Sequence, residues 1–272
     1  MMNLLKKLFN FYLDSSIHIG LSVYALTYST LLLFQLPYDK AVLYFTFYST
    51  IVTYNFIKYG SSAKRYFFVR SVYIRGIQLL SFACFGLALF YAYYLKIETL
   101  LCAAGFGVLS SLYIIPFLPS HKNFRTLIGF KIVIVSLCWA GVTVILPLMN
   151  ANVFVFETAI ALFFIQRVLL VLILMIPFEI VDLKFDAPAL GTMPQRIGIT
   201  KTKLIAYGWI LLFLAIECWQ TETYTTVFFS TIGLSVLLTI VVWQANIKKS
   251  KYFTSFWVES IPIVWFLALL FL

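Results

Sequence analysis

The residues best suited to chemistry are three carboxylates that follow a long apolar run. The run covers residues 159–177, and Glu179, Asp182 and Asp186 come directly after it. Steps of three and four residues place these side chains on one face of a helix. Carboxylates so close together repel one another unless a cation joins them, and acids beside lipid are functional-site candidates. Because Mg²⁺ favours a few carboxylates plus phosphate oxygens, the segment predicts a Mg²⁺ site for a phosphorylated ligand.

Basic and polar residues occur where further helices are expected to end beside the acids. The segment 113–131 and the end of the second predicted span carry Tyr113, Lys122, Arg125, Lys131, Asn55 and Lys58. Cations neutralise diphosphate oxygens, and Mg²⁺ can bridge a diphosphate to aspartate. The 28 phenylalanines could line an apolar cavity for a hydrocarbon tail. A phosphorylated head with a long lipid tail describes an isoprenyl diphosphate.

The elements that must position these residues are membrane helices. Hydrophobic residues make up 62% of the chain and charged residues 11%, against roughly 45–50% and 25% in soluble domains. Apolar runs of membrane-spanning length predict an all-α bundle of nine transmembrane helices in a single domain over 1–272, because backbone polar groups in lipid must be satisfied within the segment. The predicted spans are 16–36, 40–59, 72–94, 97–118, 126–148, 155–178, 202–220, 223–245 and 253–272.

The charge pattern predicts the orientation of these helices. Basic residues gather in the N-terminal segment and in alternate connections, which is the positive-inside pattern. We therefore expect an integral protein of a bacterial inner membrane with a cytoplasmic N-terminus, residues 1–15 forming an interfacial lead-in helix. The active-site loops would be cytoplasmic, near 58–72, 118–131 and 182–203. The net charge of +10 reflects this topology and contact with anionic lipid, and dispersed basic residues do not favour nucleic acid.

At this point the sequence resembles the UbiA superfamily of intramembrane aromatic prenyltransferases. The family's second motif is D-x-x-x-D followed by G-x-x-T-x-P-x-x-x-G. Here Asp182 and Asp186 supply the acids, and residues 191–198, GTMPQRIG, resemble the tail. The region around Tyr113 and Lys122 resembles the family's tyrosine-lysine segment after helix four. The resemblance covers essentially the whole chain.

The first motif departs from the family pattern. The family has N-D-x-x-D, whereas this chain has Asn55 followed by Phe56, and Tyr59 in place of the second aspartate. A cation, Lys58, stands within the motif. Half of the family's magnesium site is therefore missing, and Lys58 could contact a diphosphate directly, since lysine binds phosphate as a point charge.

The resemblance implies an enzyme that transfers a prenyl group from a prenyl diphosphate to a lipophilic acceptor at the cytoplasmic membrane face. It implies that Asp182 and Asp186 hold Mg²⁺ and the diphosphate, while Glu179 supports the site or acts on the acceptor. The expected substrate-binding residues are Asn55, Lys58, Tyr113, Lys122 and Arg125.

Other interpretations stay open on the sequence alone. A relative that kept the scaffold and lost turnover would bind isoprenoid or lipid, or assist membrane assembly, and the altered first motif favours it. A small-solute transporter is disfavoured, since transporter sites lie near the midplane. The acids could instead pair within a structural loop network. Arg167 lies within a span and could pair with Glu157, Glu217 or Glu259, and Glu259 could face a cavity.

Overall fold

The regular elements in the described part of the chain are all helices. In the computed structural model it comprises residues 2–59, 71–113, 115, 130–155, 157–186, 190–220 and 225–271, and no strand occurs within these ranges. The helices are α1 Met2–Asp14, α2 Ile17–Leu33, α3 Lys40–Tyr59, α4 Val72–Ala92, α5 Ile97–Leu112, α6 Phe130–Ala140, α7 Leu146–Asn150, α8 Thr158–Asp182, α9 Met193–Ile197, α10 Ile199–Gln220, α11 Thr226–Gln244 and α12 Ile261–Leu270, with π-helical segments η4 Gly141–Ile145 and η6 Phe253–Val258.

The predicted all-α membrane bundle is confirmed, but its span count is not. Six helices are long and apolar enough to cross a membrane, and a seventh candidate arises if the bent pair α1 and α2 forms one span. Every predicted span overlaps a helix in the described ranges. Some of these helices are short or broken, however; α5, for example, has 16 residues. Nine crossings therefore remain a prediction.

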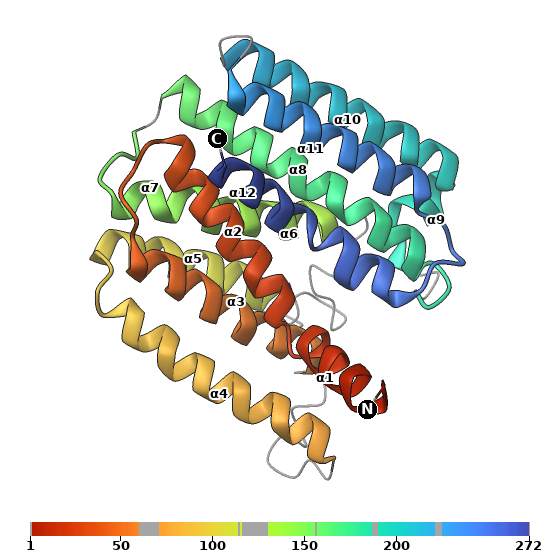
Figure 1. Ribbon diagram of the computed structural model, residues 1–272, viewed down its shortest axis with the longest axis horizontal. Coiled ribbons are helices and arrows are strands. Elements are labelled where there is room, and N and C mark those ends of the chain that lie inside the picture. Colours follow the sequence, from red (N-terminus) through yellow and green to blue (C-terminus); the bar gives the residue numbers. More distant parts are fainter. Residues whose placement is uncertain are drawn as a thin grey trace.

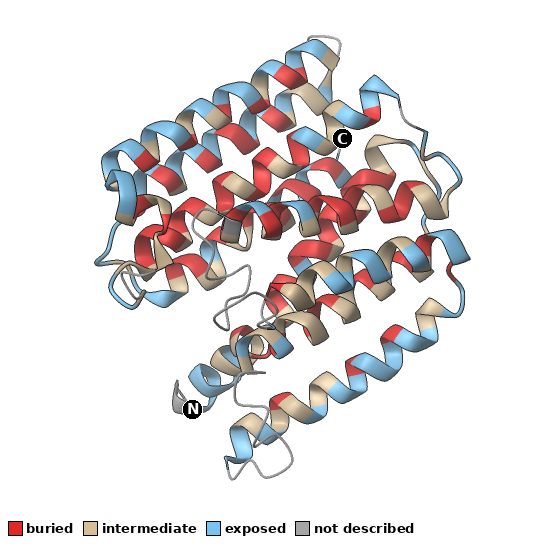
Figure 2. Ribbon diagram, turned by 180° about the vertical axis from the view of Figure 1, so that it is seen from behind, coloured by how far each residue is buried: buried red, intermediate tan, exposed pale blue. Residues whose placement is uncertain are grey.

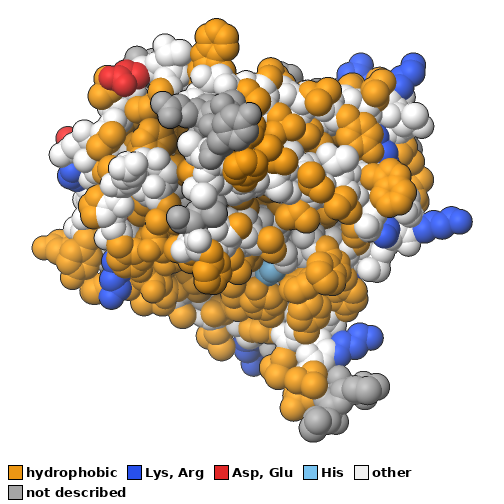
Figure 3. All heavy atoms as spheres, turned by 45° about the horizontal axis from the view of Figure 1, so that its top comes forward, with side chains coloured by type: hydrophobic (Ala, Val, Ile, Leu, Met, Phe, Trp, Pro, Cys, Tyr) orange, Lys and Arg blue, Asp and Glu red, His pale blue; other side chains and the backbone are white. Residues whose placement is uncertain are grey.

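The bundle is arranged around α8, the longest helix. Helices α10 and α11 cover one side of it, α2 and α12 lie across it, and α3 and α4 form the far side (Figure 1). The largest buried cluster joins α8 to α10, α11 and α12. Burial is concentrated on these central elements, while α4 is mostly exposed (Figure 2). The exposed face is predominantly hydrophobic (Figure 3), as a lipid-facing surface requires.

The N-terminal helix leaves the bundle at an angle. Helices α1 and α2 meet at a 53° bend, where Ser16 has a φ of 64°. The Ser16 hydroxyl donates a hydrogen bond to Asn55 Oδ1 over 2.8 Å, which ties the bend to α3. Leu4, Leu5 and Leu8 are exposed on α1, beside Lys6 and Lys7. An amphipathic helix of this kind suits the membrane interface expected from the sequence.

Helix α8 continues beyond the predicted end of its span. It contains Pro177 and runs on to Asp182, although proline removes one backbone donor. Neighbouring helices compensate such freed groups in membrane bundles. Glu179 and Asp182 therefore lie on the last turns of this helix, as their spacing predicts.

Candidate active site at one mouth of the bundle

Two of the predicted acids meet on a single lysine. The Lys131 Nζ lies 3.9 Å from Glu179 Oε1 and 3.8 Å from Asp186 Oδ2. The three side chains are largely buried, with exposed fractions of 16%, 3% and 14%. Asp186 Oδ2 has no hydrogen-bond partner, so the ammonium of Lys131 is its one described polar neighbour. Lys131 comes from the first turn of α6, which packs against α8.

The Glu179 carboxylate is fixed by backbone as well as by charge. Its Oε2 accepts a hydrogen bond from the Met193 N–H over 3.1 Å, at the start of α9. Gly191, with a φ of 56°, lets the chain turn back over the end of α8. A cavity of about 440 Å³ opens here and is lined by Lys131, Glu179, Arg196, Thr192 and neighbouring apolar residues. Residues 191–198, which resemble the tail of the family's second motif, thus contact Glu179 through the Met193 N–H.

The third predicted acid takes a different position. Asp182 ends α8, and Asp186 follows after one more helical turn, with its N–H bonded to Asp182 O at 2.9 Å. Asp182 is close enough to repel the Glu179 carboxylate. Nevertheless, no group of three or more His, Cys, Asp or Glu residues that could hold a metal occurs in the described ranges. Two of the three acids therefore flank Lys131, Asp182 lies near Glu179, and the metal-binding role expected for Asp182 and Asp186 stays a prediction.

A second cavity lies behind this mouth, at the centre of the bundle. It measures about 160 Å³, and its wall includes Tyr54, Tyr113, Trp139, Phe178 and Glu259 with aliphatic side chains from α2, α3, α6 and α8. The Trp139 Nε1–H donates to the Tyr54 hydroxyl over 2.7 Å. Tyr113, predicted to bind substrate, thus faces the central cavity. The sequence left open whether Glu259 faces a cavity, and the structure answers that it does.

The two cavities follow one another along the same pair of helices. On α8, Glu179 lines the mouth and Phe178 lines the central cavity. On α6, Lys131 lines the mouth and Val135, one turn later, lines the central cavity. A charged head group at the mouth would therefore have apolar and aromatic walls next to it.

Asn55 occupies a structural position within the altered first motif. It is fully buried, accepts from Ser16 and donates to the Ser81 hydroxyl over 2.8 Å. These bonds join the α2 bend, α3 and α4. The amide is therefore engaged by protein partners, and its predicted part in substrate binding has no support in these contacts.

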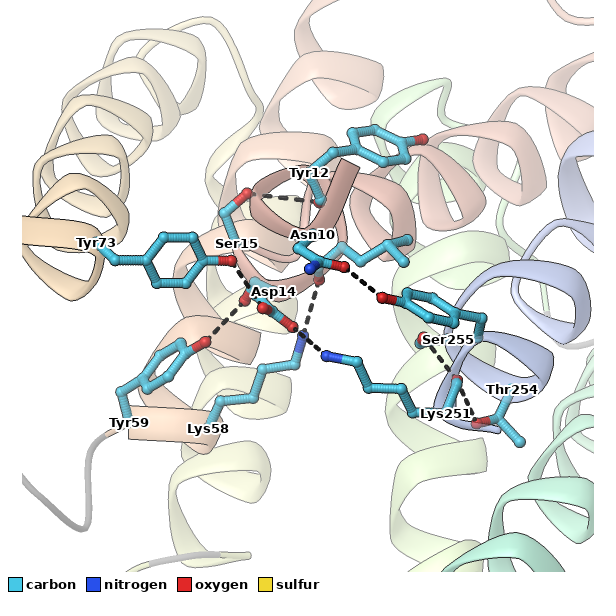
Figure 4. Close-up of polar contacts among 12 residues, drawn as sticks. Asn10, Tyr12, Asp14, Ser15, Lys58, Tyr59, Tyr73, Lys251, Thr254 and Ser255 are labelled. Atoms are coloured by element: carbon cyan, nitrogen blue, oxygen red, sulfur yellow. Dashed lines mark hydrogen bonds and ion pairs between the residues drawn. The ribbon is translucent and has the colours of Figure 1, made fainter. Parts of the chain in front are cut away.

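Lys58 belongs to a cluster separate from the acids of α8 (Figure 4). Its Nζ donates to Leu13 O over 3.3 Å, and its charge interacts with Asp14 and Glu259. The Tyr73 hydroxyl donates to Asp14 Oδ2 over 2.7 Å. This cluster holds the end of α1 against α3 and α4, where the family's first acidic motif would be.

The structure also ties Asp14 and Tyr59 to other elements. Lys251, ahead of η6, forms an ion pair with Asp14 at 3.7 Å, and the Tyr59 hydroxyl donates to Asp14 O over 3.1 Å. Lys251 is 61% exposed, so this pair is weakly stabilising. Nothing in the sequence pattern connects Asp14 with Lys251, because this contact joins the two ends of the chain.

The expectation that Arg167 pairs with a glutamate is wrong. Arg167 is 2% exposed and forms no ion pair in the described part of the chain. Its guanidinium lies 5.2 and 5.4 Å from the ring centres of Phe163 and Trp265, and Nη2 donates to the Thr30 hydroxyl over 3.2 Å. The aromatic faces partly replace a counter-ion. Glu217 instead accepts from Gln166 over 2.8 Å.

Two predicted diphosphate ligands cannot be placed. Lys122 and Arg125 lie outside the described residues, so their role remains a prediction. Lys131 lies in the same basic segment, and it contacts the acids Glu179 and Asp186. Its position in the sequence gave no signal that it would face α8.

Comparison with known proteins identifies the fold. No protein-family model and no curated protein sequence matches the chain. Among solved structures, a UbiA homologue from Archaeoglobus fulgidus bound to GPP and Mg²⁺ matches with a TM-score of 0.62 at 13% identity, over 96% of this chain and 98% of that one. A structure of digeranylgeranylglyceryl phosphate synthase matches with a TM-score of 0.58 at 13% identity, over 98% of both chains.

The chain therefore has the UbiA fold, and the resemblance drawn from its motifs is confirmed at that level. It is an integral membrane protein built on the scaffold of prenyltransferases. The Archaeoglobus homologue has also been solved with DMAPP and Mg²⁺ and with Cd²⁺. Those ligands belong to that protein, and at this identity they do not assign an activity to this one.

Proposed function

We propose that the protein is a membrane prenyltransferase that moves a prenyl group from a prenyl diphosphate to a lipophilic acceptor. The observation that carries the proposal is that α6 and α8 each contribute residues both to the charged mouth and to the aromatic central cavity. A diphosphate requires cations, which Lys131 and Arg196 supply at the mouth. A prenyl chain requires an apolar enclosure, which Phe178 and Trp139 begin.

Mg²⁺ is the cofactor implied by the fold, and the mouth offers a reduced site for it. Glu179 and Asp186 flank one point that the Lys131 ammonium occupies, and Asp186 Oδ2 is a buried acceptor without a hydrogen bond. Mg²⁺ commonly uses one or two carboxylates together with phosphate oxygens. These two residues would hold it, with Asp182 nearby, and the bound ion would neutralise charge on the departing diphosphate. Lys131 would then be free to contact the diphosphate itself.

We infer the orientation from charge. Helix α1, α9 and the end of α8 lie at the same end of the bundle (Figure 1). Most Lys and Arg side chains on the face drawn in Figure 3 lie toward its right side. Under the positive-inside rule the mouth would face the cytoplasm of a bacterial cell, with prenyl diphosphate entering from there and the lipophilic acceptor from the membrane.

The test is turnover by the purified protein in vesicles. Isotopically labelled geranyl diphosphate would be supplied with Mg²⁺ and a lipid extract of bacterial membranes, and products followed by mass spectrometry. We expect labelled prenylated lipid with release of diphosphate, lost when Asp182→Asn and Asp186→Asn are combined. A wild-type protein that binds geranyl diphosphate without forming any labelled product would contradict the proposal.

One observation favours a second candidate, a non-catalytic isoprenoid-binding relative. The place of the first acidic motif is filled by Lys58, Tyr59 and the end of α1, and the central cavity is small. Binding of geranyl diphosphate with no turnover would support this candidate. A midplane transport site is disfavoured, because the buried Arg167 side chain is packed between aromatic rings.

A further inference from the structure

A further cavity lies next to the central cavity and shares two residues with it. It measures about 120 Å³ and lies between α3, α5 and the segment from α6 to α7, with Phe45, Phe106 and Val142 in its wall. We call it the deep cavity. Tyr54 and Trp139 line the deep cavity and the central cavity alike. The Tyr54–Trp139 pair therefore stands between the two.

Helix α6 shows how the cavities follow one another. Lys131 lines the mouth and Val135 lines the central cavity. Trp139 lines both inner cavities, and Val142 lines the deep one. Steps of three and four residues keep these side chains on one side of the helix. At a rise of 1.5 Å per residue, Trp139 lies about 12 Å along the helix from Lys131. The deep cavity is thus farther from the mouth than the central cavity.

Helices α2 and α3 repeat this order. On α2, Ile19 lines the central cavity, and Val23, one turn later, lines the deep cavity. On α3, Ile57 lines the central cavity, Tyr54 lines both cavities, and Thr50 lines the deep cavity. The same sequence of cavities on three helices places the pair as a partition between the central cavity and the deep one.

The two side chains of the partition hold each other in place. The Trp139 Nε1–H donates to the Tyr54 hydroxyl over 2.7 Å. Their ring centres are 6.4 Å apart and the ring planes are nearly perpendicular, at 85°. A polar group in apolar surroundings is costly to leave without its hydrogen bond, so this arrangement is favoured over one in which the rings separate. The partition consists of two large, rigid rings.

The wall of the deep cavity suits a hydrocarbon although it contains hydroxyl groups. The hydroxyls of Ser49 and Thr50 donate to Thr46 O over 3.3 and 2.6 Å. The Ser110 hydroxyl donates to Cys138 Sγ over 3.5 Å. These donors are directed to partners within the protein, and the aromatic and aliphatic side chains of the wall remain as contacts for a ligand.

The cavity volumes indicate how much of a prenyl chain fits on each side of the partition. An apolar cavity of about 150 Å³ holds one benzene molecule, so the central cavity of about 160 Å³ holds roughly one isoprene unit. With the first isoprene unit beside the diphosphate at the mouth, the second would fill the central cavity and end at the partition. A third unit would need the deep cavity.

From this geometry we propose that the Tyr54–Trp139 pair limits the prenyl chain to two isoprene units, and that opening the pair admits a third unit into the deep cavity. The inference rests on the proposed prenyl transfer and names its substrate class, the short allylic diphosphates. Tyr54 and Trp139 act on the far end of the chain, so they set its length rather than the chemistry at the reacting carbon.

The experiment compares the binding of geranyl diphosphate with that of farnesyl diphosphate, which has one more isoprene unit. Each competes with labelled geranyl diphosphate for the purified protein in the presence of Mg²⁺. We expect the wild type to prefer geranyl diphosphate by roughly tenfold or more, because a third unit would have to displace packed rings. The preference should disappear in Trp139→Leu. The ratio of the two affinities is the readout, because changes in the diphosphate contacts cancel in it.

Two further variants control for the hydrogen bond and for folding. Tyr54→Phe loses the hydroxyl but keeps the ring, and it should retain the preference for geranyl diphosphate. Tyr54→Leu opens the partition from α3 and should lose the preference, so the test does not depend on Trp139→Leu alone. Thermal unfolding of each variant shows whether the fold is retained.

A second substitution tests where the third isoprene unit goes. Val142→Phe places a ring in the deep cavity, and when combined with Trp139→Leu it should restore the preference for geranyl diphosphate. If the double variant still binds farnesyl diphosphate as tightly as Trp139→Leu does, the third unit does not enter the deep cavity and the inference is wrong.

The wild-type result separates this inference from the proposed function. Equal affinity of the wild type for both diphosphates, or an unchanged preference in Trp139→Leu and Tyr54→Leu, would overturn the inference and leave the prenyltransferase proposal standing. A wild-type protein that binds neither diphosphate would refute the proposed function, and the inference with it.

Discussion

The ammonium of Lys131 lies 3.9 Å from the buried carboxylate of Glu179, and Asp186 approaches the same nitrogen from the end of α8. This relationship places a protein cation where two acids would otherwise face each other. It predicts that Lys131→Met lowers the thermal unfolding midpoint, since breaking a buried ion pair costs about 3 kcal/mol. It also predicts that Mg²⁺ raises that midpoint more in the variant than in the wild type, because the ion can take the vacated position.

The control for this prediction is Lys251→Met. Lys251 also pairs with an acid, Asp14, but the pair is exposed, and such pairs contribute about 0–1 kcal/mol. We expect a small shift without Mg²⁺ dependence. Equal Mg²⁺ responses in the wild type and Lys131→Met would argue against a cation site between Glu179 and Asp186.

Asn55 is expected to contribute to stability rather than to ligand binding. Asn55→Leu leaves the buried Ser16 hydroxyl without its acceptor, at a cost of about 2 kcal/mol. Thermal unfolding measures the loss, and binding of geranyl diphosphate at a temperature where the variant is folded should be unchanged. Phe56→Leu, at the exposed neighbouring position, is the control. A loss of geranyl diphosphate binding in Asn55→Leu but not in the control would show that Asn55 belongs to the substrate site.

We expect the uncompensated charge of Arg167 to lower the stability of the folded protein. Its removal in Arg167→Met keeps a long side chain between Phe163 and Trp265 and eliminates a buried cation without a described ion pair. Replacing buried charge by a similar apolar volume is often neutral or stabilising by about 1–4 kcal/mol. We expect a raised unfolding midpoint, whereas a fall of several degrees would show that the two ring contacts and the Thr30 hydrogen bond outweigh desolvation.

Gly141 provides a test of the packing of α5 on the central helices. A Cβ at Gly141 would collide with the Phe106 ring, so Gly141→Ala should cost about 1–3 kcal/mol through displacement of that ring. Gly86→Ala is the matched control, because nothing lies within 4 Å of a Cβ there. Unfolding midpoints of the two variants check the difference, and equal midpoints would contradict the packing described.

The sequence predicted the membrane bundle well, for a physical reason. Long apolar runs must be helices in lipid, so each predicted span overlaps a helix, and the acid motif of α8 pointed to the correct fold despite 13% identity. The predicted span ended at residue 178, whereas α8 runs on to Asp182, as the helical spacing of the acids indicated.

The partners within the site were harder to predict. Lys131 and Arg125 are alike in sequence, and only the packing of α6 on α8 shows that Lys131 reaches Glu179. The direction of Glu259 could not be predicted, because a single half-buried acid has no periodicity that indicates which way it points. Arg167 was expected to need a carboxylate, but Phe163 and Trp265 provide ring faces instead, and aromatic residues are too numerous in this chain for that pairing to be predicted.

The most direct test of the central claim is photo-crosslinking with a geranyl diphosphate analogue that carries a photoreactive group on its prenyl chain. Labelled peptides of the purified protein would be mapped by mass spectrometry. We predict labels on Val135, Phe178 or Trp139 in the wall of the central cavity, suppressed by excess geranyl diphosphate and not by geraniol. Labels confined to the lipid-facing side of α4 or α10, or insensitive to geranyl diphosphate, would contradict a prenyl diphosphate site between α6 and α8.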